Sequence, residues 1–125
     1  MIKKIHLLIL LSMLSACTFE QPDYVKAISS TDLNLALHNK DIFLVDVHTP
    51  KGPQIKGTDA FIPYNQVEQN QSKLPQDKNT AIYVYCLGGP MGVSAAKSLH
   101  ELGYTQIFNL TGGSNAWQAA GFEFE

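Results

Sequence analysis

The residues of this chain that are best suited to chemistry lie in a glycine-rich segment, Tyr85-Cys86-Leu87-Gly88-Gly89-Pro90-Met91-Gly92. The segment separates an apolar run at residues 81–85 from a stretch with helical spacing at residues 93–102. The start of a helix offers unpaired N–H groups and a partial positive charge, and glycines let successive N–H groups turn toward one anion. Because such groups favour the thiolate, and the thiolate is the nucleophile, we predict that Cys86 is an exposed, reactive catalytic residue.

The backbone that follows this cysteine is predicted to bind the substrate. The residues assigned to that role are Leu87, Gly88, Gly89, Pro90, Met91 and Gly92. The alternative interpretation is a structural cysteine that ends a strand, with the glycines needed only for the turn.

Asp46 and His48 are two further candidates for substrate binding. They end an apolar run at residues 42–47, and the carboxyl ends of parallel strands meet at one edge of a sheet, where ligands bind. His48 would serve there as an acid, a base or a partial cation near neutral pH. The alternative is a loop histidine and a structural aspartate that accepts hydrogen bonds from backbone N–H groups.

The elements that must position these residues alternate along the chain. Strands are predicted at residues 24–28, 42–47, 61–64, 81–85 and 106–110, and helices after the N-cap candidates at 29–31 and at 93–102 and 114–120. The runs at 42–47 and 81–85 are typical of strands buried on both faces. This alternation predicts an α/β fold, a small parallel sheet with helices on both faces.

Composition restricts the partners of the domain. The net charge is -2 and all nine basic residues are lysine, so a nucleic-acid footprint is not indicated. No arginine is present to hold sulfate, phosphate or carboxylate through two parallel hydrogen bonds. One cysteine and scattered histidines do not form a metal site, so neither a metal nor a cofactor is predicted, and we expect a monomer. Trp117 is expected in the core.

The first residues carry a different signal. Lys3 and Lys4 precede an apolar run at 5–14, which is too short to span a bilayer but is typical of a signal peptide. Leu14-Ser15-Ala16-Cys17 then resembles the lipobox of bacterial lipoproteins. We therefore divide the chain into a signal peptide (1–16), a lipidated tether (17–23) and one domain (24–125).

The lipoprotein resemblance has consequences for location. It implies that Cys17 is acylated and anchors an exported protein at the membrane, and Thr18 favours the outer membrane facing the periplasm. Cys86 would then be the only free thiol. Plain signal cleavage, or an uncleaved anchor, is the alternative.

The domain resembles the single-domain rhodaneses, or thiosulfate sulfurtransferases. The matching stretches are Leu44-Val45-Asp46-Val47-His48, Tyr85-Cys86 with Gly89 and the Ala95-Ala96 helix, and Gly112-Gly113-Ser114-Asn115-Ala116-Trp117-Gln118-Ala119-Ala120-Gly121. The resemblance implies that Cys86 takes sulfane sulfur from a small donor, holds it as a persulfide and passes it to a thiol or cyanide-like acceptor. Loop N–H groups would stabilise the anionic intermediate.

The sequence departs from that family's pattern in the loop. Met91 stands where the family usually has arginine, the earlier position holds Pro90, and His48 also replaces an arginine. Weak capture of thiosulfate is therefore expected. The alternatives are a non-catalytic rhodanese-like module that binds a partner or relays sulfur or redox state, and a phosphatase of the related dual-specificity fold, which would need a longer loop with an arginine.

Replacing Cys17 by serine should abolish lipid attachment and leave the domain folded, because the lipobox-like tetrapeptide lies outside the predicted domain. Cells that express the protein are labelled with a radioactive fatty acid, and the labelled band is compared between wild type and variant. A wild-type band without label contradicts the prediction.

Overall fold

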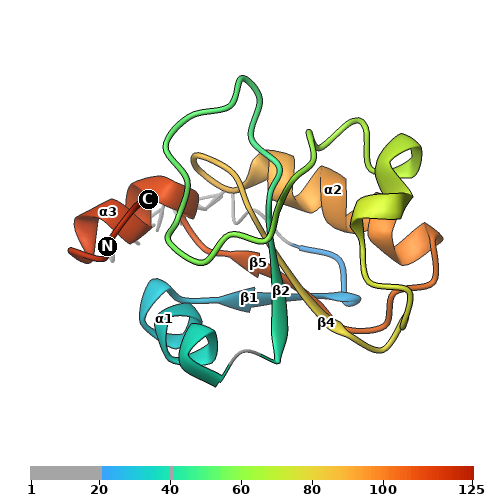
Figure 1. The fold of residues 1–125 in the computed structure, drawn as a ribbon, viewed down its shortest axis with the longest axis horizontal. Coiled ribbons are helices and arrows are strands. Elements are labelled where there is room, and N and C mark those ends of the chain that lie inside the picture. The colour runs from blue at the N-terminus through green and yellow to red at the C-terminus, as the bar shows by residue number, and fades with distance from the viewer. Residues whose placement is uncertain (1–20, 40) are drawn as a thin grey trace, which may run out of the picture.

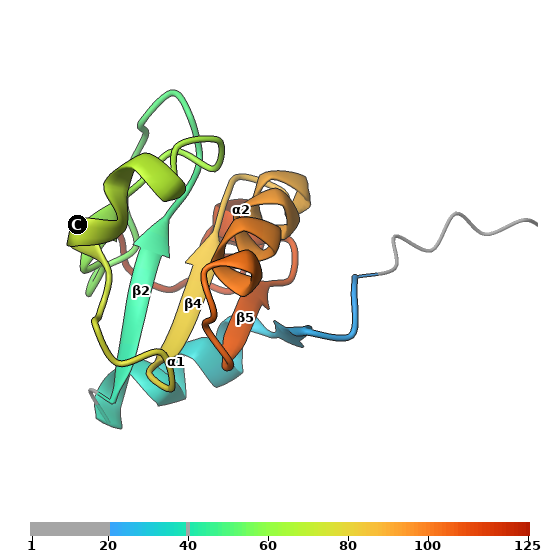
Figure 2. The same ribbon diagram turned by 90° about the vertical axis from the view of Figure 1, so that its right-hand side faces the viewer.

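The computed structural model describes residues 21–39 and 41–125, which contain a five-stranded parallel sheet (Figure 1). The strands are β1 (Val25–Ile28), β2 (Ile42–Asp46), β3 (Ala60–Phe61), β4 (Ala81–Tyr85) and β5 (Ile107–Leu110). Their order across the sheet is β1-β5-β4-β2-β3. Figure 2 shows β2, β4 and β5 side by side with their carboxyl ends at the same edge.

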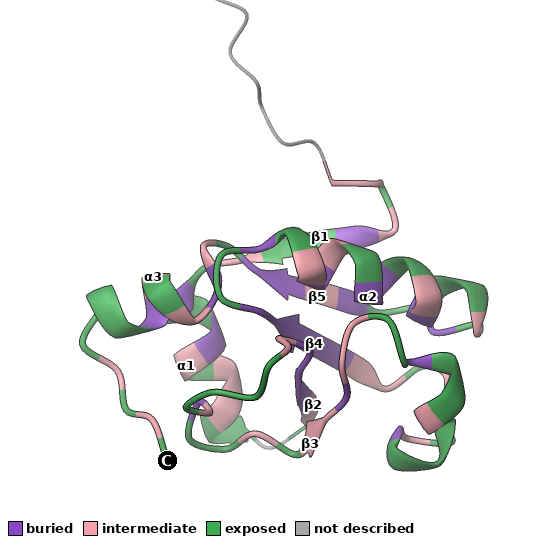
Figure 3. Cartoon of the chain, turned by 90° about the horizontal axis from the view of Figure 1, so that it is seen from above, coloured by how far each residue is buried: buried purple, intermediate pink, exposed green. Residues whose placement is uncertain are grey.

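Helices cover both faces of this sheet. They are α1 (Ser30–Asn39), α2 (Pro90–Glu101), α3 (Gly113–Ala119) and the 3-10 helix η1 (Glu68–Lys73). Residues of α2 pack in one apolar cluster, and residues of α1 and α3 pack in another. Buried residues follow the strands and exposed ones lie on the outer sides of the helices (Figure 3). The predicted α/β fold with helices on both faces is confirmed.

The alternation along β4 decides which side chain faces which cluster. Ile82 and Val84 belong to the cluster with α2, whereas Tyr83 and Tyr85 belong to the cluster with α1 and α3, because successive side chains of a strand point to opposite faces. Cys86, the next residue, therefore falls on the α2 side. Each face of the central strand is apolar, as its sequence predicts.

Several element boundaries differ from the sequence-based prediction. The strand expected at 61–64 is the two-residue strand β3, and the polar stretch before residue 79 contains η1. Helix α2 begins at Pro90 rather than at residue 93, because proline has the backbone angle of a first helical residue and no N–H that would need a partner.

The predicted signal peptide and the predicted lipidation site Cys17 lie outside the described residues. Among the helices of the described part, none is both long and apolar enough to cross a membrane.

Candidate active site

Cys86 lies directly after β4, at the carboxyl edge of the sheet where the sequence places it. The expectation that its side chain is exposed is wrong: only 2 % of the residue is accessible. The cause is the alternation of β4, which directs the thiol into the cluster that contains Val47, Ile62 and Ala95. The Cys86 thiol thus lies within the core beside α2.

The loop that follows the cysteine is held from behind by α3. The Ser114 N–H donates to the Cys86 carbonyl at 2.8 Å, and the Asn115 N–H donates to the Leu87 carbonyl at 3.1 Å. These donors belong to the first turn of a helix, where N–H groups have no partner within the helix. In a planar trans peptide the carbonyl and the following N–H point in opposite directions, so the N–H groups of Leu87 and Gly88 are directed away from α3.

Gly89 supplies the contact to the sulfur itself. Its N–H donates to Cys86 Sγ, with nitrogen and sulfur 2.9 Å apart. The residue has φ +128° and stands immediately before α2, a backbone conformation that side-chain-bearing residues rarely adopt. A glycine is required here so that the loop can fold back over the thiol. Several loop N–H groups were predicted near the sulfur, and the structure shows a contact from one of them, that of Gly89.

The other predicted loop residues fall into three groups. Leu87, Gly88 and Pro90 are exposed at the outer side of the loop, and a methyl group on Gly88 would meet nothing within 4 Å. Met91 is half-buried against the core cluster of α2. Gly92 is buried and packs against Asn109, whose Oδ1 would lie 2.1 Å from an added Cβ. Gly92 therefore allows close packing against Asn109, and its role in substrate binding stays a prediction.

Asp46 ends β2 and Cys86 follows the neighbouring strand β4, but their side chains face opposite sides of the sheet. Asp46 lies on the side of Tyr85, and its Oδ1 accepts a hydrogen bond from the His48 N–H at 3.0 Å. Gln54 Nε2 lies 3.4 Å from its Oδ2. Burial raises the pKa of Asp46 above its usual value, and these two hydrogen bonds oppose that rise. The contacts are those expected of the structural alternative for Asp46, and its role in substrate binding stays a prediction.

The loop between β2 and β3 is held by the hydroxyl of Tyr85. That oxygen accepts a hydrogen bond from the Ile55 N–H at 3.1 Å and lies 2.8 Å from Thr58 Oγ1. Burial raises the pKa of Tyr85 to about 12, so the hydroxyl stays protonated at neutral pH. The strand before Cys86 thereby fixes the segment that carries His48, which is itself half-buried.

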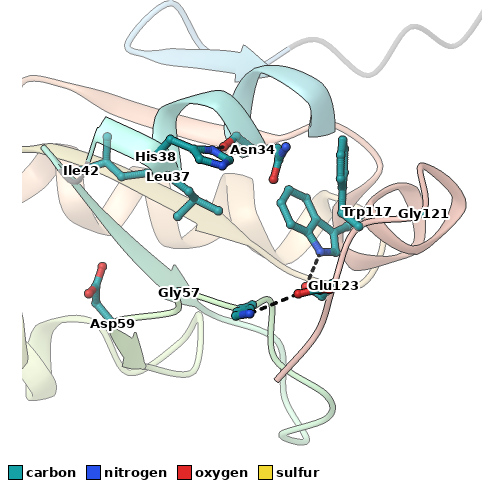
Figure 4. A pocket seen from close by; sticks show the side chains of 11 residues that line it. Asn34, Leu37, His38, Ile42, Gly57, Asp59, Trp117, Gly121 and Glu123 are labelled. Carbon is teal, nitrogen blue, oxygen red and sulfur yellow. Dashed lines mark hydrogen bonds and ion pairs between the residues drawn. The ribbon is translucent and has the colours of Figure 1, made fainter.

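A separate hollow lies in another part of the described chain. A groove of about 660 Å³ lies between α1, the segment around Gly57 and the C-terminal tail (Figure 4). Trp117 forms part of its wall and donates its indole N–H to the Glu123 carbonyl at 2.9 Å. The residue is buried in the apolar cluster of α1 and α3, so its predicted core position is confirmed. No residue from 86 to 92 lines this groove, so Cys86 lies outside it.

Three residues of the site were not predicted from the sequence. Ser114 and Asn115 donate hydrogen bonds through their backbone N–H groups, and no pattern of side chains indicates that role. Asn109 donates a hydrogen bond to the Gly89 carbonyl at 3.2 Å. Its signal was present in the sequence, because it is the one polar residue in the apolar run at 107–110.

The chain is similar to known proteins over most of its length. The sequence model of the rhodanese-like domain family matches residues 29–120. The chain belongs to the rhodanese-like family. A sulfurtransferase of Allochromatium vinosum is 32 % identical over 100 residues, which span 78 % of this chain and 92 % of that protein. A thiosulfate sulfurtransferase of Coxiella burnetii is 24 % identical over 94 residues, which span 75 % and 88 % of the two chains.

Solved structures agree on the fold. A rhodanese-related protein of Thermoplasma volcanium has a TM-score of 0.67 at 22 % identity and covers 80 % of this chain and 97 % of its own. A thiosulfate sulfurtransferase of Pseudomonas aeruginosa has a TM-score of 0.70 at 26 % identity over 79 % of this chain, which corresponds to 19 % of that longer protein.

The glycine pair of the rhodanese-like tail has a direct structural role here. Gly113 has φ +56°, and an added Cβ would lie 2.2 Å from the Cys86 carbonyl oxygen. Gly112 has φ +73°, and its Cβ would lie 2.7 Å from that of Ala116. The absence of a side chain at Gly113 lets α3 approach the cysteine loop closely enough to bind its carbonyl groups, whereas Gly112 avoids a clash within α3 itself.

Replacing Gly113 by alanine should lower the free energy of unfolding by about 1–3 kcal/mol. The added methyl group must displace the backbone of the cysteine loop, and the alanine must adopt a left-handed backbone conformation. The measurement is urea unfolding of the full-length protein. Gly52→Ala is the matched control: its Cβ would meet nothing within 4 Å, and we expect a change within about 0.5 kcal/mol. Equal unfolding midpoints for wild type and Gly113→Ala contradict the prediction.

Proposed function

We propose that this rhodanese-like protein is a sulfurtransferase in which Cys86 carries sulfane sulfur as a persulfide. The observation that carries the proposal is the hydrogen bond from the Gly89 N–H to Cys86 Sγ at 2.9 Å. Such a bond favours negative charge on the sulfur atom that must attack the donor and later leave the persulfide. The relatives named sulfurtransferase support the same function.

The reaction balances without an external oxidant. The Cys86 thiolate attacks the terminal sulfur of a persulfide or polysulfide donor; a sulfur–sulfur bond forms at Cys86 and the donor's own bond breaks, which releases a thiolate or shorter polysulfide. An acceptor thiolate then attacks the outer sulfur, the bond to Cys86 breaks, and the Cys86 thiolate returns. In both steps the negative charge passes through the sulfur that Gly89 contacts.

Access to the buried sulfur must come through the loop. Gly88 and Gly89 have open space where a Cβ would stand, and the exposed residues Leu87 and Pro90 surround them. We therefore propose that a donor approaches across Gly88, where a small displacement of that residue would uncover Sγ while the Gly89 N–H stays on the sulfur. The side chains of α2 and the bonds from α3 hold the two ends of the loop during that displacement.

The donor we favour is not thiosulfate. The chain has no arginine, and the side chains from Leu87 to Met91 carry no charge, so a dianion would meet only backbone N–H groups. A monoanionic persulfide or polysulfide needs less charge compensation. This choice follows from the residues that surround Cys86, and the acceptor we propose is likewise a thiol.

We further propose that the protein works as an exported lipoprotein, anchored through Cys17 and facing the periplasm. Support for this comes from the N-terminal sequence: two lysines, a short apolar run and the tetrapeptide that ends at Cys17. In that arrangement Cys86 has no thiol within the same chain with which to form a disulfide.

Exposure of the protein to polysulfide should add one sulfur atom to Cys86. The full-length chain with Cys17→Ser leaves Cys86 as its only thiol, and intact-protein mass spectrometry before and after treatment measures the adduct. Addition of a thiol acceptor should remove it and regenerate the starting mass. Cys86→Ser in the same background is the control and should gain nothing. If the Cys17→Ser protein is folded and takes up no sulfur, the result contradicts the proposal.

Replacing Met91 by arginine should increase turnover with thiosulfate. The guanidinium group would add a charge-assisted bond at the first turn of α2, worth about 1.5–3 kcal/mol, which corresponds to roughly one or two decades in apparent affinity. Steady-state kinetics with thiosulfate and cyanide measure it, and Met91→Gln controls for the change of shape without charge. Unchanged thiosulfate kinetics in a folded Met91→Arg protein would show that the missing arginine does not limit this site.

A further inference from the structure

Asn109 is a buried polar residue that the proposed reaction does not use directly. It lies in β5 with 3 % of its surface accessible, on the side of the sheet that faces α2. Its Nδ2 group donates to two oxygens: the Gly89 carbonyl at 3.2 Å and Gln21 Oε1 at 3.1 Å. Placing an amide in a core is costly unless its polar groups form hydrogen bonds. In Asn109 both N–H groups do so.

The orientation of this amide is fixed by its surroundings. Asn109 Oδ1 has no hydrogen-bond partner among the described residues and lies against Gly92, in the first turn of α2. The N-terminus of a helix carries partial positive charge, which suits an oxygen at that position. The reversed amide would place Oδ1 against two acceptor oxygens, so only the observed orientation is favourable.

Gly89 depends on its hydrogen bonds for its conformation. A glycine has no side chain to restrict it, and φ +128° is held here by what its N–H and carbonyl contact. The N–H contacts Cys86 Sγ at 2.9 Å. The carbonyl accepts a long bond from the Val93 N–H at 3.3 Å and the bond from Asn109. Without Asn109 the carbonyl keeps only the longer of these two bonds.

We infer that Asn109 is a positioning residue for Cys86: its carboxamide holds the Gly89 carbonyl, and thereby keeps the Gly89 N–H on the sulfur. Gly92 contributes to the same arrangement, because its lack of a side chain leaves the space that the Asn109 carboxamide occupies. Gln21 completes it from the segment before β1. The kinetic consequence rests on the proposed function of Cys86, whereas the effect on the loop does not.

The first test replaces Asn109 by alanine in the full-length protein with Cys17→Ser. We expect the Gly89 amide proton to change its chemical shift and to exchange with solvent about tenfold faster, and sulfur loading of Cys86 by polysulfide to slow about tenfold, the loss of one hydrogen bond. Asn70→Ala is the matched control, since it also removes an amide-to-carbonyl bond, the one from Asn70 to Gln66, but in another part of the chain. It should behave as wild type.

A second variant separates positioning from a merely structural role. Asn109→Asp keeps the shape of the side chain, but a carboxylate donates no hydrogen bond and a protonated carboxyl group donates one. The Gly89 amide signal should be displaced at neutral pH and return toward its wild-type position on acidification, whereas in Asn109→Ala it should not return. This variant also decides the question if Asn109→Ala does not fold.

Two results would overturn the inference: an unchanged Gly89 amide in folded Asn109→Ala, or a displacement in Asn109→Asp that acid does not reverse. If wild-type Cys86 takes up no sulfur, the proposed function fails, and the Gly89 amide still decides the role of Asn109.

Discussion

Two hydrogen bonds between the first turn of α3 and the carbonyl groups of Cys86 and Leu87 impose the constraint on which the site depends. Each bond satisfies a helix N–H that would otherwise lack a partner, and each fixes a peptide plane. The fixed planes turn the following N–H groups away from α3, and the chain then reaches Gly89, whose N–H contacts the sulfur. Gly113, which is distant in sequence, thus helps to determine the backbone geometry at Cys86.

The sequence allowed the fold to be predicted because its central strands are short apolar runs with a helical stretch between them, and these patterns are local. The position of Cys86 at the sheet edge followed from the same patterns. The burial of the thiol could not be predicted, since it depends on the phase of the alternation along β4 relative to α2. The same phase separates Asp46 from Cys86, although Asp46 ends β2 and Cys86 follows the neighbouring strand β4. Asn109 was missed as a site residue because its partners, Gly89 and Gln21, are distant in sequence.

The site combines a buried sulfur with a loop whose side chains are uncharged. Most of the favourable electrostatics therefore comes from backbone dipoles, which are fixed by hydrogen bonds and need no charged residue to be desolvated. This arrangement suits the proposed reaction, in which Cys86 Sγ carries negative charge as the attacking thiolate and again as the leaving group. It also explains why removal of one loop bond, such as that of Asn109, is expected to alter reactivity more than stability.

The strand order has a consequence for how the chain reaches its final structure. Strand β1 lies at the edge of the sheet, and its only neighbour in the sheet is β5. The paired residues, such as Val25 and Ile107, are separated by roughly 80 positions, and contacts between such distant residues form late. Strand β1 therefore stays unpaired until β5 has been synthesised. During that interval β1 offers free backbone groups to other strands, and a chaperone that shields it would raise the yield of correctly folded protein.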